Sequence, residues 1–429
     1  MSRTESFPSA ATPMRGERLT LLYSSISHGL MHLMTAFYSV IVVSLALSWN
    51  VPDYQLLELY GPAAILLGVG ALPAGWLSDR WSAPGMIVIM LVGMGLSSIA
   101  CGFVPTGDTL ALGIGLGGIG LFGSIYHSVG IGWVIRTASR PGHAMGVNGL
   151  FGSAGLALYG IFPAALISLH SWRAAFIVPG LVCLALAVAL WWHWRKGAVG
   201  DRQMPATTGV NPGREAFWRV FIILSVTMFV EGVQWQAMIN GAALLFTGRL
   251  AGEIESIRSF FGRYGVETQV ILWVGLATSM IYVLSGIAQY VIGNRVLDRY
   301  RLKTIYVVAT GLGAFAMLMV AEGSGLVVLA GAVFAAVLSS ATGPVENLLI
   351  ARFTPSRLHG LGFGAKFVIA FGVGWLAIKL ISAIKERTGD LDVLFLGLAI
   401  AAVAMCLVSL LLPGSERREE PVAVAQPAE

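Results

Sequence analysis

Apolar residues in this chain form long continuous runs that short polar segments interrupt. A helix needs about 20 mostly apolar residues to cross a bilayer, at 1.5 Å of rise per residue. Twelve runs of the 429-residue chain meet that criterion. They are residues 19–48, 55–78, 84–104, 109–135, 144–168, 172–194, 217–247, 269–295, 303–322, 325–350, 360–384 and 391–412. The pattern predicts an all-α membrane protein with twelve transmembrane helices.

Composition points to the same environment. Hydrophobic residues make up 56% of the chain and charged residues only 11%, whereas soluble proteins carry about 25% charged residues. The 53 glycines suit close contact between transmembrane helices. The three cysteines lie inside apolar runs without CxxC spacing, so we expect neither disulfides nor thiolate metal sites.

Several function classes lack their sequence signatures. There is no basic patch interleaved with aromatic residues, so nucleic acid is not an expected partner. No P-loop is present, which argues against direct ATP drive, and no HExxH or GxSxG motif points to a membrane enzyme. We expect no enzyme activity and no cofactor.

The polar segments divide the chain into five parts. Residues 1–18 are predicted to be a cytoplasmic tail, 19–194 a first six-helix bundle, 195–216 a cytoplasmic linker, 217–412 a second six-helix bundle and 413–429 a disordered cytoplasmic tail. Lys and Arg gather on the side that holds the N-terminus, and cationic loops are retained in the cytoplasm. This predicts a multi-pass protein of a bacterial-type inner membrane with both termini cytoplasmic.

The two halves share a short motif. An apolar run ends in Asp-Arg within GWLSDRW, at Asp79 and Arg80, and again within GNRVLDRYRLK, at Asp298 and Arg299. In both halves the fourth run also ends in Arg, and a Gly-rich turn opens the fifth. The shared order predicts two copies of one unit, and therefore two pseudo-symmetric bundles.

These features together resemble the major facilitator superfamily of secondary transporters over essentially the whole chain. The resemblance rests on the six-plus-six spans, the GxxxDR loop after the second span, its degenerate copy after the eighth, and SWRAAF at residues 171–176. The resemblance implies a central cavity lined by spans one, four, seven and ten. It also implies a conformational latch, which we assign to Gly75, Asp79, Arg80, Asp298 and Arg299.

Three histidines lie inside the predicted spans of the first half. His28 and His32 share one face of the first span at spacing i, i+4, and His127 lies in the fourth at a similar depth. An ionisable group near the bilayer centre costs at least about 2.5 kcal/mol, so each is a functional candidate. Three interpretations remain open: proton or substrate binding, metal binding by His28, His32 and His127, or satisfaction of a polar neighbour.

The second half carries its own ionisable residues. Glu231 in the seventh span, with Gln234 one turn later, offers a charge and hydrogen-bonding groups to a substrate. Glu346 and Lys366 fall at similar depth on adjacent spans, where an ion pair between them would be either a static tie or a coupling element.

The sequence thus predicts a secondary active transporter that moves a small solute or ion by alternating access, with proton or ion coupling. The segments SHGLMHLMTAFY and SIYHSVGIGW are similar to the magnetosome-membrane branch of the superfamily, which implies iron transport and a magnetosome membrane. One alternative is a proton-coupled exporter of a drug or organic anion. Another is a sensor or assembly factor that keeps the fold without transporting and has other membrane proteins as partners.

Overall fold

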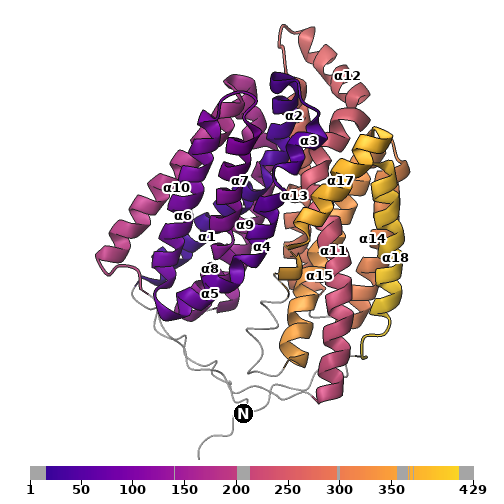
Figure 1. Cartoon of the computed structure of the whole chain (residues 1–429). Helices are drawn as coiled ribbons and strands as arrows, with labels where there is room; N and C mark the ends of the chain where they lie inside the picture. Colours follow the sequence, from indigo (N-terminus) through magenta and orange to yellow (C-terminus); the bar gives the residue numbers. More distant parts are fainter. Residues whose placement is uncertain are drawn as a thin grey trace, which may run out of the picture.

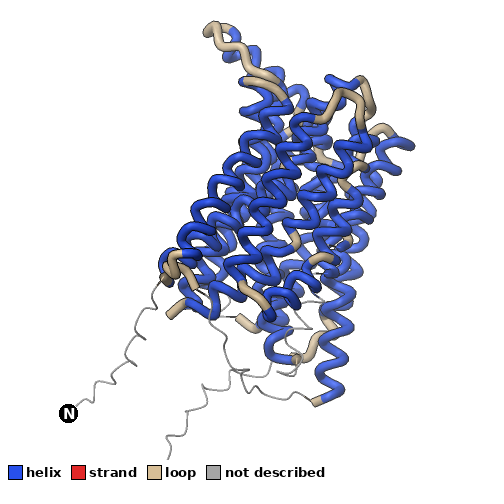
Figure 2. Tube along the Cα trace, turned by 60° about the vertical axis from the view of Figure 1, so that its left-hand side comes forward, coloured by secondary structure: helices blue, strands red, loops and turns tan. Residues whose placement is uncertain are grey.

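The computed structural model describes residues 16–139, 141–200, 213–296, 300–354, 366, 368–370 and 372–414. Throughout these residues the regular secondary structure is helical (Figures 1 and 2). Twelve helical segments are long and apolar enough to cross a membrane. The predicted all-α membrane class with twelve spans is therefore confirmed.

The first six spans form one bundle, in indigo to magenta in Figure 1. Its helices are α1 (Glu17–Ala36), α2 (Tyr38–Trp49), α3 (Asp53–Glu58), α4 (Gly61–Val69), α5 (Ala71–Arg80), α6 (Ala83–Phe103), α7 (Thr109–Gly123), α8 (Ile125–Thr137), α9 (Pro141–Leu169) and α10 (Trp172–Arg195). Three of the six spans consist of more than one helix.

The last six spans form the second bundle, in red to yellow in Figure 1. Its helices are α11 (Arg214–Arg249), α12 (Ala251–Gly262), α13 (Val270–Arg295), α14 (Leu302–Glu322), α15 (Leu326–Phe353), α17 (Gly374–Thr388) and α18 (Asp392–Ser409). One large set of buried apolar side chains runs through both bundles, and a second set, around Leu224, Tyr306 and Val345, lies within the second bundle.

A break in the fourth span positions one of the predicted site residues. α7 ends and α8 begins around Ser124, three residues before His127. The Ser124 hydroxyl donates to the carbonyl oxygen of Leu121 at 2.6 Å. Gly70, at the break between α4 and α5, lies so close that a Cβ there would be 2.4 Å from Ser124 Oγ. The two interrupted spans therefore pack at their breaks, and this contact fixes the start of α8.

The bundles are tied together at one end. We call the end with Arg195 and Arg214, which flank the linker, the linker end, and the opposite end the far end. At the far end Lys385 of α17 forms an ion pair with Asp53 of α3, and Lys379 pairs with Glu58 at 2.6 Å. Figure 1 shows α3 and α17 side by side at this end. The far end is thus closed by charged contacts between the two halves.

Candidate functional site

The three predicted histidines converge in the first bundle. His28 and His32 project from α1 toward His127 on α8, with ring centroids 5.4 Å apart for His28 and His127 and 5.2 Å for His32 and His127. One potential ligand atom from each ring lies within 4.8 Å of the other two. His28 is buried, and the other two are half-buried. The structure thus brings together three residues from two spans.

A polar network fixes the orientation of His28. Its Nδ1 lies 2.9 Å from the backbone oxygen of Asn148 on α9, and its ring stacks on Tyr126 at a centroid distance of 4.5 Å. The Asn148 amide donates to the Tyr126 hydroxyl at 2.7 Å, and Ser24 lies 3.0 Å from the same hydroxyl. A carbonyl oxygen can only accept, so Nδ1 carries the hydrogen in this bond. In the neutral ring Nε2 then presents its lone pair, and that atom is buried without a hydrogen-bond partner.

Close packing against α9 also holds the His28 ring. A Cβ built on Gly152 would lie 2.5 Å from His28 Cε1 and 2.8 Å from both ring nitrogens. Any larger residue at this position would therefore require the ring to move. Gly152 belongs to the Gly-rich fifth span, and its lack of a side chain leaves the space that the His28 ring occupies.

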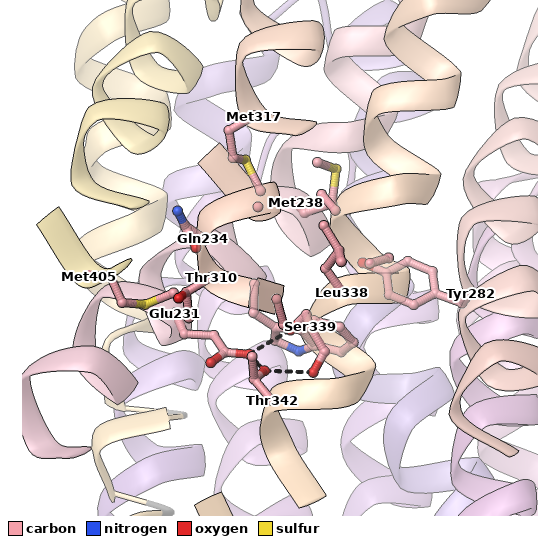
Figure 3. Close-up of a pocket in the computed structure, with 15 residues that line it drawn as sticks. Glu231, Gln234, Met238, Tyr282, Thr310, Met317, Leu338, Ser339, Thr342 and Met405 are labelled. Carbon is pink, nitrogen blue, oxygen red and sulfur yellow. Dashed lines mark hydrogen bonds between the residues drawn. The ribbon is translucent and has the colours of Figure 1, made fainter. Parts of the chain in front are cut away.

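In the second bundle Glu231 lies beside a cavity. It stands midway along α11, and its Oε1 accepts hydrogen bonds from Ser339, at 2.9 Å, and from Thr342, both on α15 (Figure 3). Its Oε2 is buried without a hydrogen-bond partner. Gln234 lines the same cavity, and its amide donates to the backbone oxygen of Leu398 at 3.0 Å. The interior volume of the cavity is about 40 Å³.

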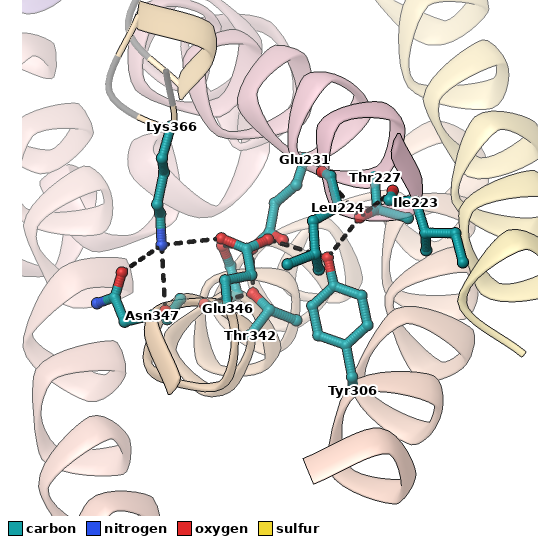
Figure 4. Close-up of polar contacts among 11 residues, drawn as sticks. Ile223, Leu224, Thr227, Glu231, Tyr306, Thr342, Glu346, Asn347 and Lys366 are labelled. Atoms are coloured by element: carbon teal, nitrogen blue, oxygen red, sulfur yellow. Dashed lines mark hydrogen bonds and ion pairs between the residues drawn. The ribbon is translucent and has the colours of Figure 1, made fainter. Parts of the chain in front are cut away.

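Glu346 and Lys366 form the ion pair that their depth suggested. Lys366 Nζ lies 3.0 Å from Glu346 Oε2, and both residues are buried. Lys366 also donates to Asn347 Oδ1 at 2.8 Å, and the Tyr306 hydroxyl lies 2.9 Å from Glu346 Oε1 and 2.8 Å from Thr227 Oγ1 (Figure 4). The two charges of this pair compensate each other, and each residue has a further hydrogen bond, Lys366 with Asn347 and Glu346 with Tyr306. Glu231, in contrast, keeps one unpaired oxygen.

Only part of the predicted latch lies in the described structure. Gly75 is on α5, where a Cβ would meet Ser128 at 3.5 Å. The Arg80 guanidinium lies 4.2 Å from the centroid of the Trp76 ring and donates to the Trp76 backbone oxygen at 3.1 Å. The Asp79 side chain, Asp298 and Arg299 lie outside the described residues. The latch therefore stays a prediction.

Sequence reasoning missed the hydroxyl partners of these groups. Tyr126 adjoins His127, Thr227 precedes Glu231 by four residues, and Thr342 precedes Glu346 by four. Spacing of i, i+4 puts two side chains on one helix face, so a search for hydroxyls one turn from each ionisable residue would have found both threonines. Tyr306 lies on a different helix, α14, and no sequence signal linked it to Glu346.

The histidine cluster and the acidic residues Glu231 and Glu346 lie in separate bundles. The histidines come from spans one and four, and Glu231 and Glu346 come from spans seven and ten. The residues that line the cavity beside Glu231 all belong to α11, α13, α14, α15 and α18. This cavity therefore lies within the second bundle and is not shared between the two halves.

The chain is similar to known transporters. A family model described as Major Facilitator Superfamily matches residues 24–256. A gallate transporter of Pseudomonas putida is 27% identical over 176 residues, which are 40% of this chain and 39% of that protein. The match thus spans well under half of the length of this curated relative.

Three solved structures share the fold. A D-xylose–proton symporter matches with a TM-score of 0.67 and 15% identity over 92% of this chain and 98% of its own. A POT family transporter in complex with 5-aminolevulinic acid matches with a TM-score of 0.72 and 12% identity, over 94% of this chain and 97% of its own. A bacterial homologue of the human lysosomal transporter Spinster, in an inward-facing and unoccupied conformation, matches with a TM-score of 0.65 and 13% identity, over 94% of this chain and 95% of its own. With the family model covering more than half of its length, this chain belongs to the Major Facilitator Superfamily of membrane transporters.

Proposed function

We propose that this protein is a proton-coupled secondary transporter whose cargo is a divalent transition-metal cation. The observation that carries the proposal is the convergence of His28, His32 and His127, whose ligand atoms lie within 4.8 Å of one another in the membrane interior. An isolated histidine inside a span needs only one polar neighbour. Three on two spans, facing one another, constitute a ligand set.

The chemistry of the cluster suits a transient metal site. Imidazole nitrogen binds Zn, Cu, Fe and Ni well, and the bond from Nδ1 of His28 to a backbone carbonyl is the usual support for a histidine that binds through Nε2. Ligands on one tetrahedral ion with bonds of about 2.1 Å lie about 3.4 Å apart, so small ring rotations would close the site. Three protein ligands leave a position open for exchange. Iron(II) belongs to this class, in line with the resemblance of the histidine segments to the magnetosome-membrane branch.

We place proton uptake at Glu231. Its buried Oε2 has no hydrogen-bond partner, so a proton can be added there without breaking an existing bond. Glu346 is bonded to Lys366 and Tyr306 and is the less accessible carboxylate. Rocking of the two bundles would expose metal and proton sites alternately to the two sides. We assign the linker end to the cytoplasm of an inner membrane, because the positively charged residues gather there.

Transport by the full chain in proteoliposomes tests the proposal. Vesicles that contain a fluorescent chelator are exposed to Fe(II), Mn(II), Co(II) or Zn(II) with and without an imposed pH gradient. We expect uptake of at least one ion in the wild type, and a loss of at least about ten-fold in initial rate in His32→Ala. His170→Ala, at an exposed position outside the cluster, is the matched control. Equal rates for wild type and His32→Ala would contradict the proposal.

A second candidate is proton-coupled transport of an organic anion. The similarity of part of the chain to a protein named gallate transporter favours it, and Lys366 provides a buried cation. The Lys366 charge is already compensated by Glu346, so it is not free to bind an organic anion, and we therefore favour a metal ion as the cargo. Gallate uptake in the same vesicles, unaffected by His32→Ala, would favour the anion. A folded protein that moves neither would favour the non-transporting sensor or assembly factor.

A further inference from the structure

The cavity beside Glu231 has a chemistry that differs from that of the histidine cluster. It lies between α11, α13, α14, α15 and α18, and Figure 3 shows side chains from several of these helices around it. Its interior is small, about 40 Å³, so a ligand larger than a few water molecules would require the flexible methionine side chains of the lining to move.

The lining contains one carboxyl group. Glu231 is the only charged residue among the described residues that line the cavity. Ser339 and Thr342 both donate to its Oε1, which leaves Oε2 buried and unpaired. A carboxylate oxygen without a partner in the membrane interior is costly. A cation in the cavity would provide that partner.

Several hydrogen-bond donors of the lining are already used, whereas the buried Tyr282 hydroxyl has no partner. Ser339 and Thr342 donate to Glu231, Thr310 donates to the backbone oxygen of Val307 at 3.1 Å, and the Gln234 amide donates to Leu398. An anion needs donors or positive charge, and these groups offer it little. The described lining has no positively charged residue and one unpaired hydroxyl donor, so it favours a cation over an anion.

The remaining surface suits an organic cation more than a hydrated metal ion. Trp235 and Tyr282 meet edge to face with ring centroids 5.5 Å apart, and aromatic rings attract alkylated ammonium groups. Met238, Met317 and Met405 complete the apolar surface with flexible, polarisable thioethers that adapt to irregular ligands. A hard metal ion would keep most of its bound water and would have a single carboxylate as its protein ligand, so the cavity suits it poorly.

We propose that this cavity binds a small organic monocation, a quaternary ammonium ion or a protonated amine, with its charge at Glu231 and its organic groups against Trp235, Tyr282 and the methionines. The site is distinct from the metal cluster, since its described lining residues all belong to the second bundle. It requires neither metal transport nor a proton gradient, but it uses the carboxylate at which we place proton uptake, so a proton and an organic cation would compete for Glu231 Oε2.

An isosteric pair of probes tests the role of charge. Benzyltrimethylammonium and neopentylbenzene have the same shape, and only the first carries a charge. Binding to the detergent-purified full chain is measured by isothermal titration calorimetry. We expect the cation to bind at least about ten-fold more tightly than the hydrocarbon in the wild type, and Glu231→Gln to remove most of that difference. Glu267→Gln, at an exposed loop position, is the control and should bind as the wild type does.

A second variant covers the case in which Glu231→Gln does not fold. Trp235→Leu removes an aromatic wall and leaves the carboxylate, and we expect it to weaken cation binding several-fold. Trp273→Leu, on α13 outside the cavity lining, should have no effect. Equal affinity of the wild type for the two probes, or cation binding that neither Glu231→Gln nor Trp235→Leu weakens, would overturn the proposal. Metal transport measured on the same preparation keeps this outcome separate from the fate of the proposed function.

Discussion

Lys385 of α17 and Asp53 of α3 form an ion pair that joins the two bundles at the far end. Their side chains are 18% and 27% exposed, so the pair is more sheltered than that of Lys379 and Glu58, at 46% and 37%. The Ser382 hydroxyl adds a bond of 2.9 Å to the backbone oxygen of Tyr54. Opening of the far end must break all three contacts. They therefore stabilise the conformation described here relative to the one open at the far end.

Removal of the Asp53 charge should shift this equilibrium. Partly exposed ion pairs contribute up to about 1 kcal/mol, so we expect Asp53→Asn to raise the population open at the far end by about five-fold. Spin labels at the exposed positions Gln55 and Glu386 would report the change as a longer distance by double electron–electron resonance. Glu58→Gln should act in the same direction with a smaller effect, because its pair is more exposed.

The control for this prediction is an ion pair that does not cross between bundles. Glu255 and Arg258 pair at 2.8 Å within α12. Glu255→Gln should leave the distance distribution unchanged. If Asp53→Asn gives the wild-type distribution as well, the far-end pairs do not set the balance between the two states.

Gly152→Ala should weaken metal binding while the fold is kept. The new Cβ would be 2.5 Å from His28 Cε1, so the ring must leave its place beside Asn148 and Tyr126. Loss of groups that orient a metal ligand lowers affinity by about 10- to 100-fold. Calorimetric titration with Zn(II) at equal protein concentration measures the change.

The matched control is Gly149→Ala on the same helix, where a Cβ would meet nothing within 4 Å. Both substitutions raise helix propensity, by up to about 1 kcal/mol, so a difference between them reports on His28 alone. Equal metal affinity in the two variants would show that the position of the His28 ring is unimportant for binding.

Lys366→Met should be strongly destabilising. It leaves the buried carboxylate of Glu346 without its cation, and breaking a buried ion pair from one side costs about 3–5 kcal/mol. The double variant Glu346→Gln with Lys366→Met should recover much of that loss, because no uncompensated charge remains. Thermal unfolding in detergent measures both. Lys379→Met, which breaks an exposed pair, should cost at most about 1 kcal/mol, and a similar cost for Lys366→Met would contradict the buried-pair assignment.

The sequence predicted the parts of this structure that depend on the bilayer. Twelve apolar runs gave twelve spans, because a helix that crosses hydrocarbon has a fixed minimum length. The rarity of ionisable residues inside the runs pointed to His28, His32, His127, Glu231, Glu346 and Lys366. Their estimated depths predicted that His28 and His127 lie close together and that Glu346 and Lys366 form an ion pair, as the structure shows.

Features that depend on helix rotation and packing were not predictable. The far-end pair of Asp53 and Lys385 joins residues from different halves, and nothing in either segment marks its partner. The contact of Gly152 with His28 depends on how α9 is rotated against α1, and the glycines spaced along α9 do not show which of them faces His28. The cavity beside Glu231 is formed by five helices, and a hydrophobic pattern does not encode such a void.

Glu231→Gln tests the assignment of the proton site. The amide keeps the size of the side chain and cannot take up a proton, so a metal gradient and a pH gradient should no longer be linked. We expect the variant to exchange labelled metal across proteoliposomes at equal pH and to lose accumulation driven by an imposed pH gradient. Exchange and accumulation must be measured on the same vesicles, because loss of both would indicate a blocked carrier and not an uncoupled one. Accumulation that persists in Glu231→Gln but is lost in Glu346→Gln would move the proton site to Glu346, and would mean that the bond to Lys366 opens during the cycle.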